Sequence, residues 1–284
     1  MKKIKDFLLH LRLNYQLFIL SGPFLLGVLL SDSFSRLQLI QFLSVHILLF
    51  GGVTAYNSYF DKDEGPIGGL YNPPKMDFWM LVASWVLQVV GLGIAFYSGL
   101  IFTFVYVISV FIFWMYSSPH VRLKGRPIAS LVAMGFGTVF CACLLGYFSS
   151  TLETRFSLQV LVAALGTTFL VISMYPLSQV YQVEEDRKRG DNTFASVYGK
   201  RGVKNLFLAL FPIGVVTISI VLGQIHYIFG TVFLTGSVLS AMYTLKVIQS
   251  IKMDRSDYKQ VMRVKYFDGM AFTLVMSALI LVSI

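Results

Sequence analysis

The sequence predicts an all-α fold: a polytopic membrane helical bundle of nine transmembrane helices, or eight in the alternative count, around a central cavity open to the cytoplasmic side. Three observations predict it: an apolar composition, apolar runs of membrane-spanning length, and cationic residues confined to one side. Of 284 residues, 56% are hydrophobic and 13% are charged. A chain this apolar cannot form the polar surface that a water-soluble protein needs, but it can form the apolar surface of a membrane protein. We expect a single domain over residues 1–284.

Apolar runs of about 20 residues, the length that crosses a hydrocarbon core of about 30 Å, define the expected helices. They cover 14–31, 37–60, 78–98, 99–117, 127–149, 156–182, 203–223, 224–247 and 266–284. The third and fourth runs are divided at Gly99, and the seventh and eighth at Gly223 and Gln224, so eight spans is the alternative. In lipid each backbone donor needs an internal partner, so these runs are expected to be helices.

The distribution of lysine and arginine supports this count. If the spans alternate in direction, every lysine and arginine except Arg36 and Arg155 falls on one side. The positive-inside rule then places the N-terminus in the cytoplasm, and we expect a multi-pass protein of the bacterial inner (plasma) membrane. Topology and anionic lipid headgroups explain the net charge of +9, so no nucleic-acid partner is implied.

Two acidic clusters follow the second and sixth runs, on the same side of the membrane. The first comprises Asp61, Asp63 and Glu64; the second comprises Glu184, Glu185, Asp186 and Asp191. Asn57 and Asp61 are four residues apart and share a helix face, as do Gln182 and Asp186. Two helix ends thus present amide and carboxylate oxygens toward one possible cavity.

These oxygens match the ligands of Mg²⁺, which takes one or two carboxylates together with water and phosphate oxygens. The alternative is that the acids are merely solvated helix ends. A third loop on this side carries Arg122, Lys124 and Arg126, whose charges could neutralise a diphosphate. Taken alone, that loop is also explained by the positive-inside rule.

The motifs resemble the UbiA-type intramembrane prenyltransferase superfamily. Asn57 and Asp61 match its first motif. Asp186, Gly190 and Thr193 match the second half of its second motif. The loop from Tyr116 to Lys124 is similar to a Tyr-Ser-x-Pro-Pro-x-x-Leu-Lys stretch of the chlorophyll synthase branch. Two motif carboxylates are replaced, one by Gly65 and one by Gln182, which marks a divergent member.

The resemblance implies transfer of an isoprenoid chain from an allylic diphosphate to a lipophilic or aromatic acceptor, with Mg²⁺ as cofactor. The expected catalytic residues are Asn57, Asp61 and Asp186. The expected metal ligands are Asp61, Asp63, Glu64, Gln182, Glu185 and Asp186. The expected diphosphate-binding residues are Arg122, Lys124, Tyr116 and Lys188.

Two other functions remain open at this point. Gly65 and Gln182 remove two carboxylates, which would suit a catalytically silent relative that binds lipid. The acids could instead form the pathway of a cation or solute transporter. Against the transporter, they cluster at one membrane surface, whereas transporter sites lie near the midplane.

Overall fold

The computed structural model of the chain describes residues 2–31, 33–150 and 157–283. Arg155, the start of the expected span 156–182 and the last residue of the span 266–284 lie outside the described residues. The described chain is helical, with one isolated β-bridge between Ile67 and Leu70. The all-α membrane bundle predicted from the sequence is confirmed.

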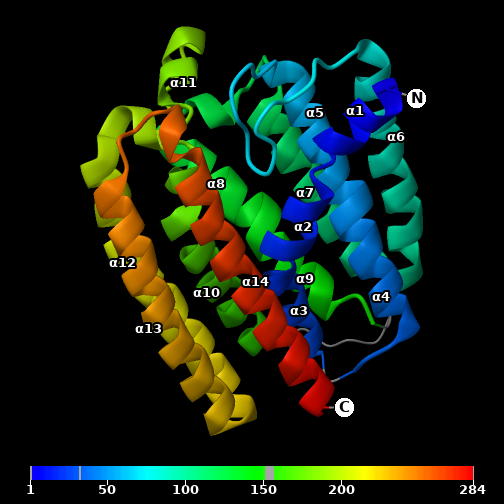
Figure 1. Cartoon of the computed structure of the whole chain (residues 1–284). Helices are drawn as coiled ribbons and strands as arrows, with labels where there is room; N and C mark the ends of the chain where they lie inside the picture. The colour runs from blue at the N-terminus through cyan, green and yellow to red at the C-terminus, as the bar shows by residue number, and fades with distance from the viewer. Residues whose placement is uncertain (1, 32, 151–156, 284) are drawn as a thin grey trace.

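The first half of the chain builds four of the long spans and the bent N-terminal pair (Figure 1). Its helical segments are α1 (Lys2–His10), α2 (Leu13–Ile19), α3 (Ser21–Leu30), α4 (Arg36–Leu43), the π-helical η1 (Ser44–Phe50), α5 (Gly51–Asp61), α6 (Phe78–Ala95), η2 (Phe96–Ser98), α7 (Leu100–Ser117), η3 (Leu123–Gly125), α8 (Pro127–Met134), the π-helical η4 (Gly135–Phe140) and α9 (Cys141–Tyr147).

The second half supplies the longest helices and a short one at the end of the bundle where the N-terminus lies (Figure 1). Its segments are α10 (Leu158–Met174), η5 (Tyr175–Ser178), α11 (Val183–Arg189), α12 (Phe194–Ile225), α13 (Tyr227–Ser250), η6 (Arg255–Asp257) and α14 (Tyr258–Ser283). The C-terminus lies at the opposite end of the bundle.

Eight helical stretches among the described residues are long and apolar enough to span a membrane, and a bent pair makes up to nine. The pair is α1–α2 with α3, bent by 45° at Leu20. The continuous span expected at 14–31 is therefore broken. Pro23 explains the break, because it cannot donate a backbone hydrogen bond to the Ile19 carbonyl and its ring crowds that carbonyl.

The seventh span starts earlier than expected. The apolar run begins at residue 203, but α12 starts at Phe194, where Thr193 caps its N-terminus. Gly199 interrupts the helix with a φ of 60°, a conformation that glycine adopts without strain. The polar first turns of α12 thus lie before the membrane segment and carry the chain away from α11.

Close backbone contact between α3 and α9 fixes the middle of the bundle. A Cβ atom added at Gly27 would lie 2.0 Å from the Cys143 carbonyl oxygen, and one at Gly146 would lie 1.9 Å from the Phe24 carbonyl oxygen. No side chain larger than hydrogen fits at either glycine. Small residues allow such approach in membrane bundles, where packing replaces the hydrophobic effect between helices.

Candidate active site

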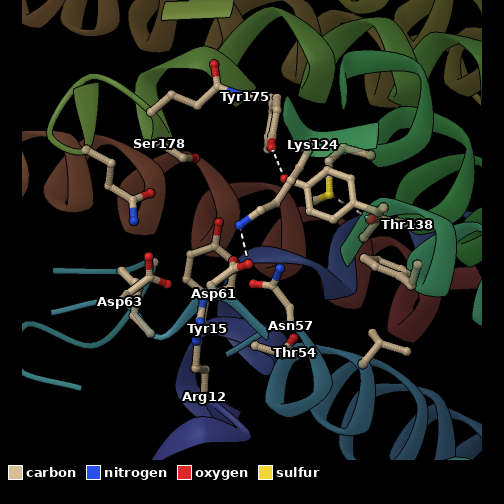
Figure 2. Close-up of a pocket in the computed structure, with 18 of the residues that line it drawn as sticks. Arg12, Tyr15, Thr54, Asn57, Asp61, Asp63, Lys124, Thr138, Tyr175 and Ser178 are labelled. Carbon is tan, nitrogen blue, oxygen red and sulfur yellow. Dashed lines mark hydrogen bonds and ion pairs between the residues drawn. The ribbon is translucent and has the colours of Figure 1, made fainter. Parts of the chain in front are cut away.

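The C-terminal end of α5 forms one wall of a cavity of about 150 Å³ (Figure 2). The helix ends at Asp61, and Lys62 turns the chain with a left-handed φ of 50°. Asn57 and Asp61 both line the cavity, as their spacing of four predicts. The Asn57 amide donates to the Ser117 hydroxyl at 3.0 Å, which links α5 to the end of α7.

Lys124 reaches into this cavity from η3 and forms an ion pair with Asp61 (Figure 2). Arg122, just before η3, adopts a left-handed φ of 46°, which turns the chain toward the cavity. The side chains of Lys124 and Asp61 are only 9% and 7% exposed. Each charge therefore depends on the other for compensation, because burial of an unpaired charge is costly.

The second acidic cluster meets the first around Arg189. On α11, Arg189 lies one turn after Asp186, and its Nη2 lies 3.1 Å from Asp186 Oδ1. Its Nη1 contacts the Asp63 carboxylate from the loop after α5, and donates to the Asp61 carbonyl at 3.1 Å. The ends of the second and sixth spans thus come together, and two carboxylates converge on a single positive charge.

Asp186 has an unusual environment for a carboxylate. Burial raises the pKa of Asp186 to about 6, although the nearby Arg189 charge and a hydrogen bond from Thr193 act in the opposite direction. The Thr193 hydroxyl donates to Asp186 Oδ2 at 3.0 Å, so the side chain is fixed from both sides.

Arg122 binds Asp191 rather than the cavity. Its Nε and Nη2 donate to the two Asp191 oxygens at 2.7 and 2.8 Å, a bidentate pair. This hydrogen bonding raises the pKa of Arg122. Asp191 lines the cavity and Arg122 stands behind it. Arg122, expected from the sequence to bind diphosphate, thus lies one residue removed from the cavity wall and pairs with Asp191.

Glu185 and Glu64 do not line the cavity either. The Glu185 carboxylate accepts the backbone N–H groups of Glu64 at 2.8 Å and Gly65 at 3.2 Å, so it ties α11 to the loop after α5. A Cβ atom added at Gly65 would lie 2.6 Å from Glu185 Oε2. Glu185 thus occupies the space that a side chain at position 65 would need, and Glu64 itself is exposed.

Lys188 faces solvent. Its side chain is 72% exposed and pairs with Glu184 at 2.7 Å along the outer face of α11. Because successive helix residues rotate by about 100°, the face that carries Asp186 and Arg189 cannot also carry Lys188. Lys188, expected from the sequence to bind diphosphate, therefore points away from the cavity, and Arg189 occupies the inward position.

Most of the expected site residues are brought to one cavity, and three that were not expected join them. The expected residues on its wall are Asn57, Asp61, Asp63, Tyr116, Lys124, Gln182 and Asp186. The unexpected charged residues there are Arg12, Arg189 and Asp191. The spacing of three between Asp186 and Arg189 was the available signal for Arg189, but three basic residues in a row obscured which one faces inward.

The carboxylates present suit Mg²⁺. In the described parts of the chain, no three acidic, histidine or cysteine side chains form a preformed metal cage. Mg²⁺ does not require one, because one or two carboxylates with water and substrate phosphates are its usual ligands. Asp63 and Asp186 already converge on the Arg189 charge, and Asp61 lies beside them on the cavity wall. The donor atoms and their convergence therefore fit the ion.

A second, apolar cavity of about 290 Å³ adjoins the first. Its walls come mainly from α10, η4, α13 and α14. We call it the apolar chamber. The residues that line both cavities are Tyr15, Leu20, Met134, Thr138 and Tyr175. A molecule with a charged head and a hydrocarbon tail could therefore occupy both at once.

Comparison with known proteins identifies the family of the chain. The model of the UbiA prenyltransferase family matches residues 20–274. The chain belongs to the UbiA prenyltransferase family. The sequence-based resemblance is thus confirmed, and the chain is an integral, multi-pass member of that family.

Among curated relatives, identities are low. The chain is 26% identical over 270 residues to lycopene elongase/hydratase of Corynebacterium glutamicum, covering 90% of this chain and 91% of that protein. It is 23% identical over 210 residues to 1,4-dihydroxy-2-naphthoate octaprenyltransferase of Bacillus subtilis. That match covers 67% of this chain and 65% of the Bacillus protein.

A solved structure shows the same fold. A UbiA homologue from Archaeoglobus fulgidus, bound to GPP and Mg²⁺, superposes with a TM-score of 0.72 at 18% identity. The match covers 97% of this chain and 99% of that one. At this identity the likeness establishes the UbiA fold.

Proposed function

We propose that this protein is a Mg²⁺-dependent membrane prenyltransferase that transfers an isoprenoid chain from an allylic diphosphate to a lipophilic or aromatic acceptor. The observation that carries the proposal is the meeting of two acidic helix ends in one cavity that opens into an apolar chamber. Its family membership and the GPP and Mg²⁺ bound to the Archaeoglobus homologue support it.

The polar cavity would hold the diphosphate. Asp61, Asp63 and Asp186 would hold Mg²⁺, with the Gln182 side-chain oxygen beside them. When bound, Mg²⁺ supplies positive charge that stabilises the departing diphosphate. Lys124 and Arg189 would turn from their present carboxylate partners toward phosphate oxygens, a charge-assisted exchange that leaves every charge compensated.

The residues at the junction of the two cavities would surround the reacting carbon. Tyr116 and Tyr175 are hydrogen-bonded to each other through their hydroxyls, and both line the polar cavity. Aromatic faces stabilise a nearby positive charge, such as the one that develops on the allylic carbon as its bond to oxygen breaks. The apolar chamber would hold the hydrocarbon tail and exclude water from that carbon.

The proposed orientation places this cavity at the cytoplasmic surface of a bacterial inner membrane. The α11 helix, the ends of α5 and α7 and the N-terminus lie at one end of the bundle (Figure 1). Lysine and arginine residues gather in and beside these segments, which suits the cytoplasmic side.

Release of diphosphate tests the proposed function directly. The purified chain in lipid nanodiscs is given geranyl diphosphate with Mg²⁺ or with EDTA, together with a bacterial lipid extract as the acceptor source. We expect Mg²⁺-dependent diphosphate release, reduced at least about 100-fold in Asp61→Ala and Asp186→Ala, since lost transition-state charge stabilisation has effects of this size. Mass spectrometry of the extract identifies the prenylated acceptor.

Glu184→Gln is the matched control, because Glu184 lies on the same short helix but faces solvent beside Lys188. Its activity should equal that of the natural chain. Well-folded protein with no Mg²⁺-dependent release would favour the catalytically silent lipid-binding relative. Ion or solute flux in liposomes without diphosphate release would favour the transporter.

A further inference from the structure

Asp268 is a carboxylate inside a membrane-spanning helix that the proposed reaction does not use. It lies on α14, and its partly exposed side chain lines the apolar chamber. Ionisable residues inside membrane spans are energetically costly and usually mark a functional site. Its position in a cavity wall makes it accessible to a ligand.

Two hydroxyl groups from α13 hold this carboxylate in place. Ser240 donates to Asp268 Oδ1 at 2.6 Å, and Thr244 donates to Oδ2 at 3.2 Å. Within the described residues, Asp268 forms no ion pair. A carboxylate can accept about four hydrogen bonds, so two bonds leave it with unused capacity toward the chamber.

Lys265 restricts what that ligand can be. It lies one turn earlier on α14 and also lines the chamber. Its ammonium donates to the hydroxyls of Tyr15 and Ser178, and lies 4.9 Å from the centre of the Tyr15 ring. A second cation beside Asp268 would meet this charge on the same helix face, whereas a neutral hydroxyl would not.

The allylic donor cannot supply the missing hydrogen bond. Its tail is a hydrocarbon without donors, and its diphosphate belongs in the polar cavity. A donor group opposite Asp268 must therefore come from the other substrate. An isolated polar group in an otherwise apolar pocket fixes the orientation of a ligand, which is the usual division of roles in small-molecule sites.

We propose that Asp268, held by Ser240 and Thr244, binds a hydroxyl group of the acceptor inside the apolar chamber. The acceptor is then a lipophilic molecule with at least one free hydroxyl. Calling this ligand the acceptor rests on the proposed prenyltransferase function; the hydroxyl site itself rests on the chamber and its contacts.

Photolabelling without diphosphate or Mg²⁺ tests the site independently of catalysis. The chain in nanodiscs is irradiated with a twelve-carbon alcohol that carries a diazirine in its chain, and separately with the methyl ether of the same compound. We expect the alcohol to label peptides of α13 and α14 at least about tenfold more efficiently than the ether, as suits a hydrogen bond to a charged group. Equal labelling would overturn the inference.

Variants distinguish a hydrogen bond between the alcohol and Asp268 from nonspecific partitioning of the alcohol into the apolar chamber. Asp268→Leu should remove the preference for the alcohol. The isosteric Asp268→Asn covers the case in which the leucine variant does not fold. It should reduce the preference of the alcohol over the ether to a few-fold. Ser237→Ala, which changes another chamber-lining hydroxyl on α13, should leave it unchanged. A preference that persists in both Asp268 variants, or that Ser237→Ala also removes, would overturn the inference.

The outcome is distinguishable from failure of the proposed function. Absent alcohol preference with normal diphosphate release would leave the prenyltransferase and remove the hydroxyl site. Alcohol preference without diphosphate release would leave a lipid-binding site in a catalytically silent relative.

Discussion

The polar cavity holds four carboxylates, each paired with a lysine or an arginine, whereas the adjoining chamber holds one carboxylate bonded to two hydroxyls. In the polar cavity, a charged ligand could take over the lysine and arginine partners of these carboxylates. In the chamber, Asp268 has no cationic partner among the described residues to give up, and its remaining hydrogen-bonding capacity suits a neutral polar group. Acids lining two neighbouring cavities of one bundle therefore face different partners: cations in the polar cavity and hydroxyl groups in the chamber.

Removing one partner of the buried pair between Lys124 and Asp61 gives the largest expected effect. Lys124→Met should lower the free energy of unfolding by about 3–5 kcal/mol, because it leaves a buried charge uncompensated. The double variant Asp61→Asn with Lys124→Met should recover most of that stability, but not diphosphate release. Denaturation in mixed micelles measures the stability.

A stable single variant would contradict this prediction, because it would mean that Asp61 is compensated by another group. An active double variant would show that neither residue takes part in the reaction. Asp268→Asn, which changes the carboxylate of the apolar chamber, is compared with Lys124→Met. It removes no ion pair, so its loss of stability should be smaller than that of Lys124→Met.

Reducing the size of the apolar chamber should have a smaller effect that depends on tail length. Gly236 lines the chamber, and a Cβ atom added there would meet nothing within 4 Å. Gly236→Leu should slow turnover of geranylgeranyl diphosphate by about tenfold relative to dimethylallyl diphosphate, because the added side chain competes with a long tail. Competition between the two donors measures the ratio.

Gly223→Leu is the matched control for chamber size. A Cβ atom at Gly223 also meets nothing within 4 Å, but this residue does not line the chamber. In this variant, the turnover of geranylgeranyl diphosphate relative to dimethylallyl diphosphate should be unchanged. An equal change in both variants would mean that helix stability, rather than chamber volume, determines the effect.

Lys188 should have the smallest effect. Its pair with Glu184 is exposed, so solvent screens it and it should contribute little to stability. Lys188→Ala should leave diphosphate release unchanged, while Arg189→Ala, one residue later, should reduce it clearly. Parallel release assays measure both. A large loss in Lys188→Ala would restore the sequence-based expectation that this residue binds diphosphate.

The sequence predicted the features that follow from length and spacing. Span lengths identified the helices, and the separations of four in Asn57–Asp61 and Gln182–Asp186 placed these residues toward one cavity. The same reasoning could not choose among Arg187, Lys188 and Arg189, because the rotation of a short helix decides which faces inward. It also missed the break before Pro23, since a continuous apolar run conceals a missing backbone donor.

Asp268 illustrates a different limit. Within the apolar run 266–284 it is a visible acid, but its meaning depends on Ser240 and Thr244, which lie more than twenty residues earlier on another helix. Composition and periodicity cannot reveal which face of one helix meets which face of another. Such contacts become visible only when the packing of α13 against α14 is known.

The glycine contacts between α3 and α9 have a consequence for how lipophilic molecules enter. At Gly27 and Gly146 the backbones of α3 and α9 are in direct contact. No side chain of the described residues lies between the two helices there that could change rotamer to let a molecule pass. Gly269 of α14 is similarly pressed against the backbone of α2 at Ile19, 2.6 Å from an added Cβ atom. The outer helix α13 is held to α12 in the same way, because a Cβ atom added at Gly230 would lie 2.4 Å from the Ser219 carbonyl oxygen. A lipophilic molecule from the bilayer would therefore have to pass where helices meet through side chains, which can change rotamer, rather than along these backbone seams.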